Sequence, residues 1–179
     1  MRRVSEDTEN KTTMGFVYKN LNGEIVPIPP DVKPNWRISA YAAILSENRQ
    51  KILAVKSDLH EKYFLPGGGI ESDESLEDGL RRECLEEAHC SIELLDPQPF
   101  FFRESYFCDT FFNPVGDYWH AISSAFFAKK GSQSVSIIPE SPEKIIDITW
   151  LTIDSHLPDQ FHHFYQPMIE AILKRLNGS

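Results

Sequence analysis

Several features that define large classes of protein are missing from this sequence. Its 179 residues contain no apolar run that approaches the ~20 residues needed to cross a membrane. Two arginines stand near the start, but no apolar segment follows them, so no secretory signal is predicted. Internal repeats and low-complexity segments are absent, and the apolar content of 41% is that of a globular protein. We therefore expect a soluble, cytoplasmic protein with one main domain and no membrane partner.

Cysteine is scarce as well. The three cysteines, Cys84, Cys90 and Cys108, are odd in number and have no C-x-x-C spacing. This argues against a disulfide framework and against a structural zinc site. We predict that they are buried thiols.

Basic residues are outnumbered, 18 against 27 acidic ones. The formal charge of −9 disfavours binding to a nucleic acid polymer, because such binding requires a basic surface. Between Glu71 and Glu87, eight acidic residues stand against two arginines, which places −6 of the −9 within 17 residues. A charge concentrated in this way indicates a site, not a general property of the surface.

The rest of the sequence predicts a layered domain of the α/β/α or α+β type. Apolar periodicity predicts strands over 36–45, 51–56, 92–95, 100–112, 118–128 and 145–151, and helices over 75–88 and 161–176. Two short β-type runs around Asn22-Gly23 predict a hairpin, and the prolines after it predict an extended arm. We therefore expect a tail, hairpin and arm over residues 1–35 and the main domain over 36–179.

The acidic segment follows a loop with three consecutive glycines, Gly67 to Gly69, which let the backbone approach a ligand closely. The helix after it has an apolar stripe formed by Leu76, Leu80, Cys84 and Ala88. Glu83 and Glu87 fall beside or within this stripe, and they also form an i,i+4 pair of like charge. Such a pair beside a packed face needs a cation, and hard divalent cations prefer oxygen ligands. The alternative is an acidic face exposed to solvent.

These residues resemble the Nudix box, G-x5-E-x7-R-E-U-x-E-E-x-G-U, where U is a bulky apolar residue. The chain has Gly68-x5-Glu74-x7-Arg82-Glu83-Cys84-x-Glu86-Glu87-x-His89-Cys90. Every spacing fits, and His89 is the one departure, at the glycine position. The resemblance covers 23 residues and implies a Nudix-type α/β/α sandwich with a mixed β-sheet, to which the N-terminal hairpin is added.

The resemblance also implies an activity, which is hydrolysis of a nucleoside diphosphate linked to another moiety, by attack of water on phosphorus. The substrate would be a small nucleotide and the cofactor Mg²⁺ or Mn²⁺. The implied metal ligands are the carbonyl of Gly67 and the carboxylates of Glu83, Glu86 and Glu87.

Other roles follow from the same resemblance. Arg82 would hold a box glutamate in place, and Glu74 would support the helix and loop. The general base is either a box glutamate, such as Glu83, or a carboxylate from a distal loop. Glu140 and Glu143 are the candidates in that loop, with Glu143 the preferred one.

Position 89 is expected to affect the local backbone more than the chemistry. A glycine there would suit a left-handed residue at the end of a helix. A histidine with positive φ costs on the order of 1 kcal/mol, so we expect a strained or shifted helix end.

Three other functions stay open. The chain could be a non-catalytic, nucleotide-binding regulatory Nudix domain or an acidic protein-interaction domain. It could also be an isoprenoid diphosphate isomerase, which would require a catalytic cysteine and glutamate in the pocket. His120, His162 and His163 lack the spacing of metal ligands and are expected in the core or on the surface. The N-terminal hairpin and arm would either form a homodimer or cover the pocket.

Overall fold

The computed structural model describes residues 16–20, 23–59, 61–109, 116–132 and 144–178. Their strands are β1 (Tyr18–Lys19), β2 (Ile25–Val26), β3 (Asn35–Leu45), β4 (Lys51–Ser57), β5 (Gly67–Gly69), β6 (Ile92–Leu94), β7 (Phe101–Asp109), β8 (Asp117–Lys130) and β9 (Ile145–Thr152). Their helices are α1 (Leu76–Ala88), α2 (Leu157–Gln160) and α3 (Gln166–Leu176).

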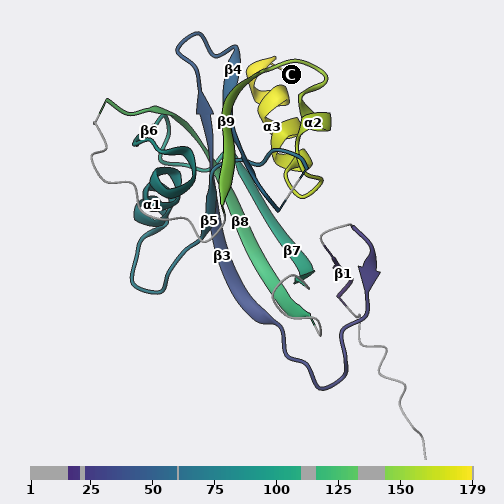
Figure 1. The fold of residues 1–179 in the computed structure, drawn as a ribbon. Helices are drawn as coiled ribbons and strands as arrows, with labels where there is room; N and C mark the ends of the chain where they lie inside the picture. The colour runs from purple at the N-terminus through teal and green to yellow at the C-terminus, as the bar shows by residue number, and fades with distance from the viewer. Residues whose placement is uncertain (1–15, 21–22, 60, 110–115, 133–143, 179) are drawn as a thin grey trace, which may run out of the picture.

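The strands form one mixed sheet between two helical layers. Their order across the sheet is β2-β1-β7-β8-β3-β4-β9, with β5 paired to β3 and β6 paired to β8. β3 runs parallel to β8 and antiparallel to β4. α1 covers one face of the sheet, and α2 and α3 cover the other (Figure 1). This confirms the predicted α/β/α sandwich with a mixed sheet.

The central strand β3 is buried on both faces. Ala40, Ala42 and Ile44 belong to the hydrophobic cluster that contains α1, whereas Tyr41 and Ala43 belong to the cluster that contains α3. Successive residues of a strand point to opposite faces, so a strand covered on both sides has a continuous apolar sequence. We call these two sides of the sheet the α1 face and the α3 face.

Helix α1 begins and ends where the sequence predicted. Ser75 is its N-cap, and the Ser75 side chain accepts a hydrogen bond from the backbone N–H of Asp78 at 3.1 Å. The helix ends at His89, which is left-handed with φ of 51° and whose backbone N–H donates to the carbonyl of Cys84. The strained histidine at this end is therefore present in the structure.

The prediction that Leu76 belongs to the packed stripe of α1 is wrong. Leu76 is 43% exposed, whereas Leu80 and Cys84 are fully buried. Leu76 lies in the first turn, beside an apolar cavity of about 260 Å³ that Ile38 and Phe102 also line. The first turn therefore extends past the region where the helix packs against the sheet.

The C-terminal helix starts later than predicted. Phe161 has extended backbone angles and forms a β-bridge with Tyr63, so the helix predicted from residue 161 does not begin there. Residues 157–160 form the separate helix α2, and α3 starts at Gln166 with Pro167 in its first turn. The amphipathic character of α3 is confirmed, because Ile169 and other α3 residues are buried against the sheet.

The predicted hairpin is present as β1 and β2, which pair antiparallel. Gly23 has φ of +82°, as a turn glycine allows, while Asn22 lies outside the described residues. β1 also pairs in parallel with β7, with Lys19 opposite Phe107. The hairpin therefore continues the main sheet, and the predicted tail before it lies outside the described residues.

The three cysteines are buried free thiols, as predicted. Burial raises the pKa of the Cys84 thiol well above its ordinary value, and it also raises that of Cys90. Within the described ranges, none of the helices is both long and apolar enough to cross a membrane.

The left-handed conformation of His89 yields a stability test. We expect His89→Gly to raise the free energy of unfolding by about 0.5–1 kcal/mol, because glycine adopts positive φ without the steric cost of a Cβ. Urea unfolding of the full chain measures this. Arg49, with φ of 56°, is a matched site where glycine should give a similar gain. His89→Ala should give none, and a less stable His89→Gly variant would contradict the account.

Candidate active site

The glycine segment forms the short strand β5 against β3. Gly67, Gly68 and Gly69 pair with Tyr41, Ala40 and Ser39 respectively. Gly67 has φ of +135°, and a Cβ added there would lie 2.2 Å from the carbonyl oxygen of Ala40. Only glycine fits at this position.

The absence of a side chain at Gly68 brings the backbone against a carboxylate of α1. A Cβ at Gly68 would lie 2.7 Å from Oε1 of Glu83. The next turn of the helix supplies Glu87, which is buried and whose Oε2 accepts a hydrogen bond from the N–H of Gly67 at 2.9 Å. The helix and the glycine segment are thus joined directly at two neighbouring points.

Arg82 is the centre of the polar network. Its Nε and Nη2 donate to the two oxygens of Glu74, at 3.1 and 2.7 Å, and Nη2 also donates to the carbonyl of Gly69 at 3.1 Å. Its Nη1 lies 3.1 Å from Oε1 of Glu83 and 3.3 Å from Oε2 of Glu86. One guanidinium therefore connects three carboxylates and the glycine segment.

The electrostatics of the network are unbalanced. Burial raises the pKa of Glu83, and the favourable charge of Arg82 reduces this effect without cancelling it. The hydrogen bond from Arg82 holds the pKa of Glu74 below its ordinary value, and the same bond raises the pKa of Arg82. The carboxylates of Glu83 and Glu86 are only 14% and 12% exposed, so solvent compensates little of their charge. The site has more negative charge than Arg82 neutralises.

No three His, Cys, Asp or Glu side chains within the described residues are gathered closely enough to enclose a metal ion. Instead, Glu83 and Glu86 converge on the point that Nη1 of Arg82 occupies, and one oxygen of Glu87 is bonded to Gly67. All the donors are oxygens in a site with excess negative charge, which is the chemistry that hard divalent cations prefer. The chemistry of these donors therefore suits Mg²⁺ or Mn²⁺, while their spacing in this structure does not enclose an ion.

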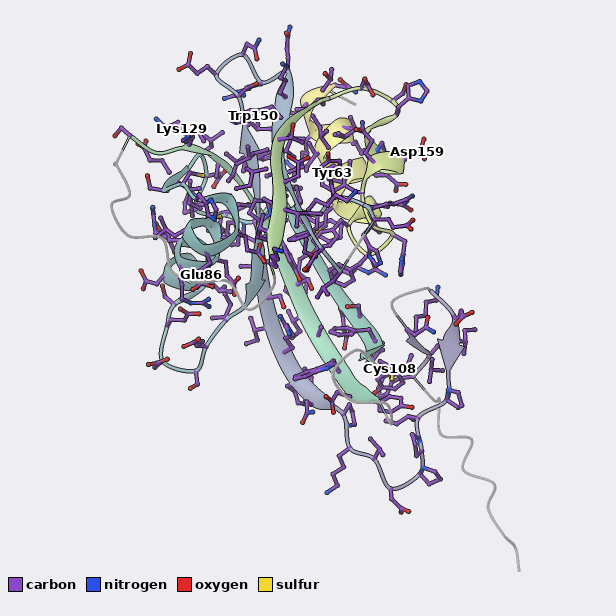
Figure 2. The ribbon with its side chains drawn as sticks, in the orientation of Figure 1. Tyr63, Glu86, Cys108, Lys129, Trp150 and Asp159 are labelled. Atoms are coloured by element: carbon purple, nitrogen blue, oxygen red, sulfur yellow. The ribbon has the colours of Figure 1, made fainter. Side chains whose placement is uncertain are left out.

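Glu140 and Glu143 lie outside the described residues. Cys108 is fully buried with Tyr18 and Tyr118 at the hairpin end of β7 (Figure 2). A reactive thiol needs access to its substrate, so this packing argues against an isomerase that depends on Cys108.

The sequence reasoning missed Arg37. Its guanidinium lies against Gly69, where an added Cβ would be 3.2 Å from Nη2, and it also lowers the pKa of Glu83. Its Nε is hydrogen-bonded to Ser39 at 3.3 Å, and its Cζ lies 5.9 Å from the ring centroid of Trp119. The sequence feature that could have identified Arg37 is that it is the single charged residue in a mostly apolar strand.

Comparisons with known proteins agree with this architecture. The sequence model of the NUDIX domain matches residues 36–172. The nucleoside triphosphatase NudI of Enterobacter sp. (strain 638) is 29% identical over 94 residues, which are 52% of this chain and 64% of that protein. The chain thus spans less than two thirds of the length of this curated relative.

Solved structures show the same fold. A NUDIX hydrolase from Nitrosomonas europaea has a TM-score of 0.59 and 19% identity, covering 82% of this chain and 90% of its own. The MutT protein of Methanosarcina mazei Go1 has a TM-score of 0.55 and 22% identity, covering 83% and 100%. An ADP-ribose pyrophosphatase from Streptococcus suis has a TM-score of 0.53 and 18% identity, covering 78% and 90%.

Together with the α/β/α sandwich, these matches place the molecule in the class of proteins that contain a NUDIX domain. The chain belongs to the Nudix family, because the model of the family's domain covers well over half of its residues.

The glycine segment offers a matched pair of substitutions. Gly67→Ala should lower the free energy of unfolding by about 2–4 kcal/mol, since it combines strained φ with a clash against the backbone of Ala40. Gly69→Ala should cost less than about 1 kcal/mol, because its new methyl group meets only the movable end of Arg37. Urea unfolding of both variants gives the comparison, and equal costs would contradict the geometry.

Proposed function

We propose that this protein is a metal-dependent pyrophosphohydrolase that cleaves the diphosphate link of a nucleoside diphosphate attached to another moiety. The observation that carries the proposal is the convergence of Glu83 and Glu86 on one positive charge beside the glycine segment. The negative charge in excess of Arg82 supports a divalent cation at this point. The names of the matched relatives, a nucleoside triphosphatase and an ADP-ribose pyrophosphatase, support the same class of reaction.

The residues that would hold Mg²⁺ or Mn²⁺ are Glu83, Glu86 and Glu87, with the carbonyl of Gly67. When bound, such an ion neutralises the pyrophosphate, polarises phosphorus and makes a bound water easier to deprotonate. Glu87 already keeps the glycine segment at a fixed position on the helix through its bond to the Gly67 N–H. The substrate's phosphates would therefore meet a backbone that the helix has positioned in advance.

Arg82 and Glu74 act as positioning residues in this proposal. Arg82 orients Glu83 and Glu86 through one nitrogen, while its paired bonds to Glu74 fix the plane of the guanidinium. Glu74 also accepts a hydrogen bond from the backbone N–H of Glu71 at 2.8 Å, which connects the loop before the helix to the same network.

Glu83 is the candidate general base on the described part of the chain. Burial raises its pKa, and a carboxylate with a raised pKa accepts a proton from water more readily. Glu143, outside the described residues, is the alternative base from a distal loop. The net charge of −9 favours a small nucleotide over a nucleic acid polymer, and we propose that the enzyme works in the cytoplasm.

The activity test replaces single carboxylates by amides. Glu86→Gln and Glu87→Gln should each lower kcat by about 100-fold or more, since each removes a proposed cation ligand with almost no change in side-chain volume. The assay is a panel of (d)NTPs, nucleotide sugars, ADP-ribose, dinucleotides and dinucleoside polyphosphates with Mg²⁺ and Mn²⁺, scored for released products.

Glu77→Gln is the matched control for this test. Glu77 is also on α1, but its side chain is 52% exposed and pairs with Arg81. It should keep near-wild-type kcat. If both Glu86→Gln and Glu87→Gln keep full activity, the proposed function is wrong.

A second test needs no substrate. Mg²⁺ at ten times its dissociation constant should raise the free energy of unfolding by about 1.4 kcal/mol, because the ion binds only the folded state. Thermal unfolding with and without Mg²⁺ measures the gain. Glu86→Gln should lose most of it, and Glu77→Gln should retain it. A wild-type chain that gains nothing from Mg²⁺ or Mn²⁺ would count against the metal site.

A further inference from the structure

The α3 face of the sheet carries a row of residues that leads away from the glycine segment. Gly69 of β5, Ser39 of β3, Ser123 of β8 and Arg103 of β7 stand directly opposite one another in successive strand pairs. Three steps of about 4.8 Å between strands place the start and end of the row roughly 14 Å apart. The row therefore runs across the sheet on one face, from the glycine segment of β5 to β7.

The near end of this row is electrostatically linked to the carboxylates. Arg37 lies on the α3 face, two residues before Ser39, and it reaches Gly69 and influences Glu83. Arg37 therefore places a positive charge where the row begins, next to the glycine segment.

Two buried hydroxyls beside Arg103 have unmet hydrogen-bonding capacity. The Oγ atoms of Ser105 and Ser123 have no hydrogen-bond partner among the described protein groups. Ser123 of β8 is opposite Arg103 of β7. Ser105 is two residues after Arg103 on β7, so all three side chains are on the α3 face. An unpartnered buried hydroxyl is unfavourable, and a hydrogen bond to a polar ligand would remove that cost.

The far end of the row is basic. Lys19 of β1 is opposite Phe107, on the same face of the sheet as Arg103, and the hairpin brings Gly23 next to His163. Lys62 precedes Tyr63, whose carbonyl accepts the N–H of His162 at 2.9 Å. Three segments far apart in the sequence thus bring basic side chains together.

The described residues supply no ion-pair partner for the cations of this group. None of Lys19, Lys62 and Arg103 forms an ion pair with a carboxylate of the described residues. Burial and then the charges of all three lower the pKa of His163. In a chain with a net charge of −9, an unpaired group of cations indicates an anionic ligand.

We propose that Lys19, Lys62, Arg103 and His163 form a binding site for a phosphate group of the substrate that is remote from the cleaved anhydride. The proposal rests on the proposed function and narrows its substrate to nucleotides that carry such a second phosphate group. The roughly 14 Å length of the row separates this group from the pyrophosphate that is cleaved. The N-terminal hairpin then has a direct role, because it supplies Lys19.

The test is metal-free binding of inorganic pyrophosphate to the full chain in EDTA, measured by isothermal titration calorimetry. Lys19→Gln and Arg103→Gln should each weaken binding at least fivefold. Lys51→Gln removes the same charge from an exposed position on β4 and should weaken it less than twofold. Lys62→Gln, also at an exposed position, repeats the test if Arg103→Gln fails to fold.

Two results would overturn the site. One is a wild-type chain that does not bind pyrophosphate at millimolar concentration, and the other is an equal loss in Lys51→Gln. Glu86→Gln should bind metal-free pyrophosphate as the wild type does while losing turnover. Unchanged turnover in Glu86→Gln would refute the proposed function and leave the binding result intact, so the two failures are distinguishable.

Discussion

The guanidinium of Arg82 is the interaction on which the rest of the site depends. Without its charge, Glu74, Glu83 and Glu86 would face one another in a partly buried space, with no other ion-pair partner among the described residues. Because Arg82 also binds the carbonyl of Gly69, the same charge joins the loop to the helix. The arrangement of these three carboxylates therefore depends on one side chain, which also links them to the glycine segment.

The glycine segment and the central strand form the second constraint. Gly67 lies so close to Ala40 that no side chain fits between them, and the resulting contact brings the backbone N–H of Gly67 within reach of Glu87. The segment is held by the sheet on one side and by α1 on the other. This double attachment holds the backbone of the glycine segment and the carboxylates of α1 in fixed positions relative to one another.

Much of this architecture was predictable because it depends on neighbouring residues. The limits of α1 follow from Ser75 as N-cap and from the 3.6-residue repeat, and the apolar run of β3 predicted a strand. The start of α3 was not predictable, because the bridge between Phe161 and Tyr63 joins residues far apart in the chain. The exposure of Leu76 depends on where the sheet ends, and the apolar periodicity of the helix gives no information about that.

The sequence by itself determined the chemical character of the site, since the spacing of the glutamates on a helix places their carboxylates on adjacent turns of one side. Only the tertiary structure decided how those groups are used, with Glu87 turned to the glycine segment and Glu83 and Glu86 turned to Arg82. It alone brought Lys19 to the α3 face. Strand pairing joins segments whose separation in the chain has no local signature, so such neighbours appear only when the sheet is formed.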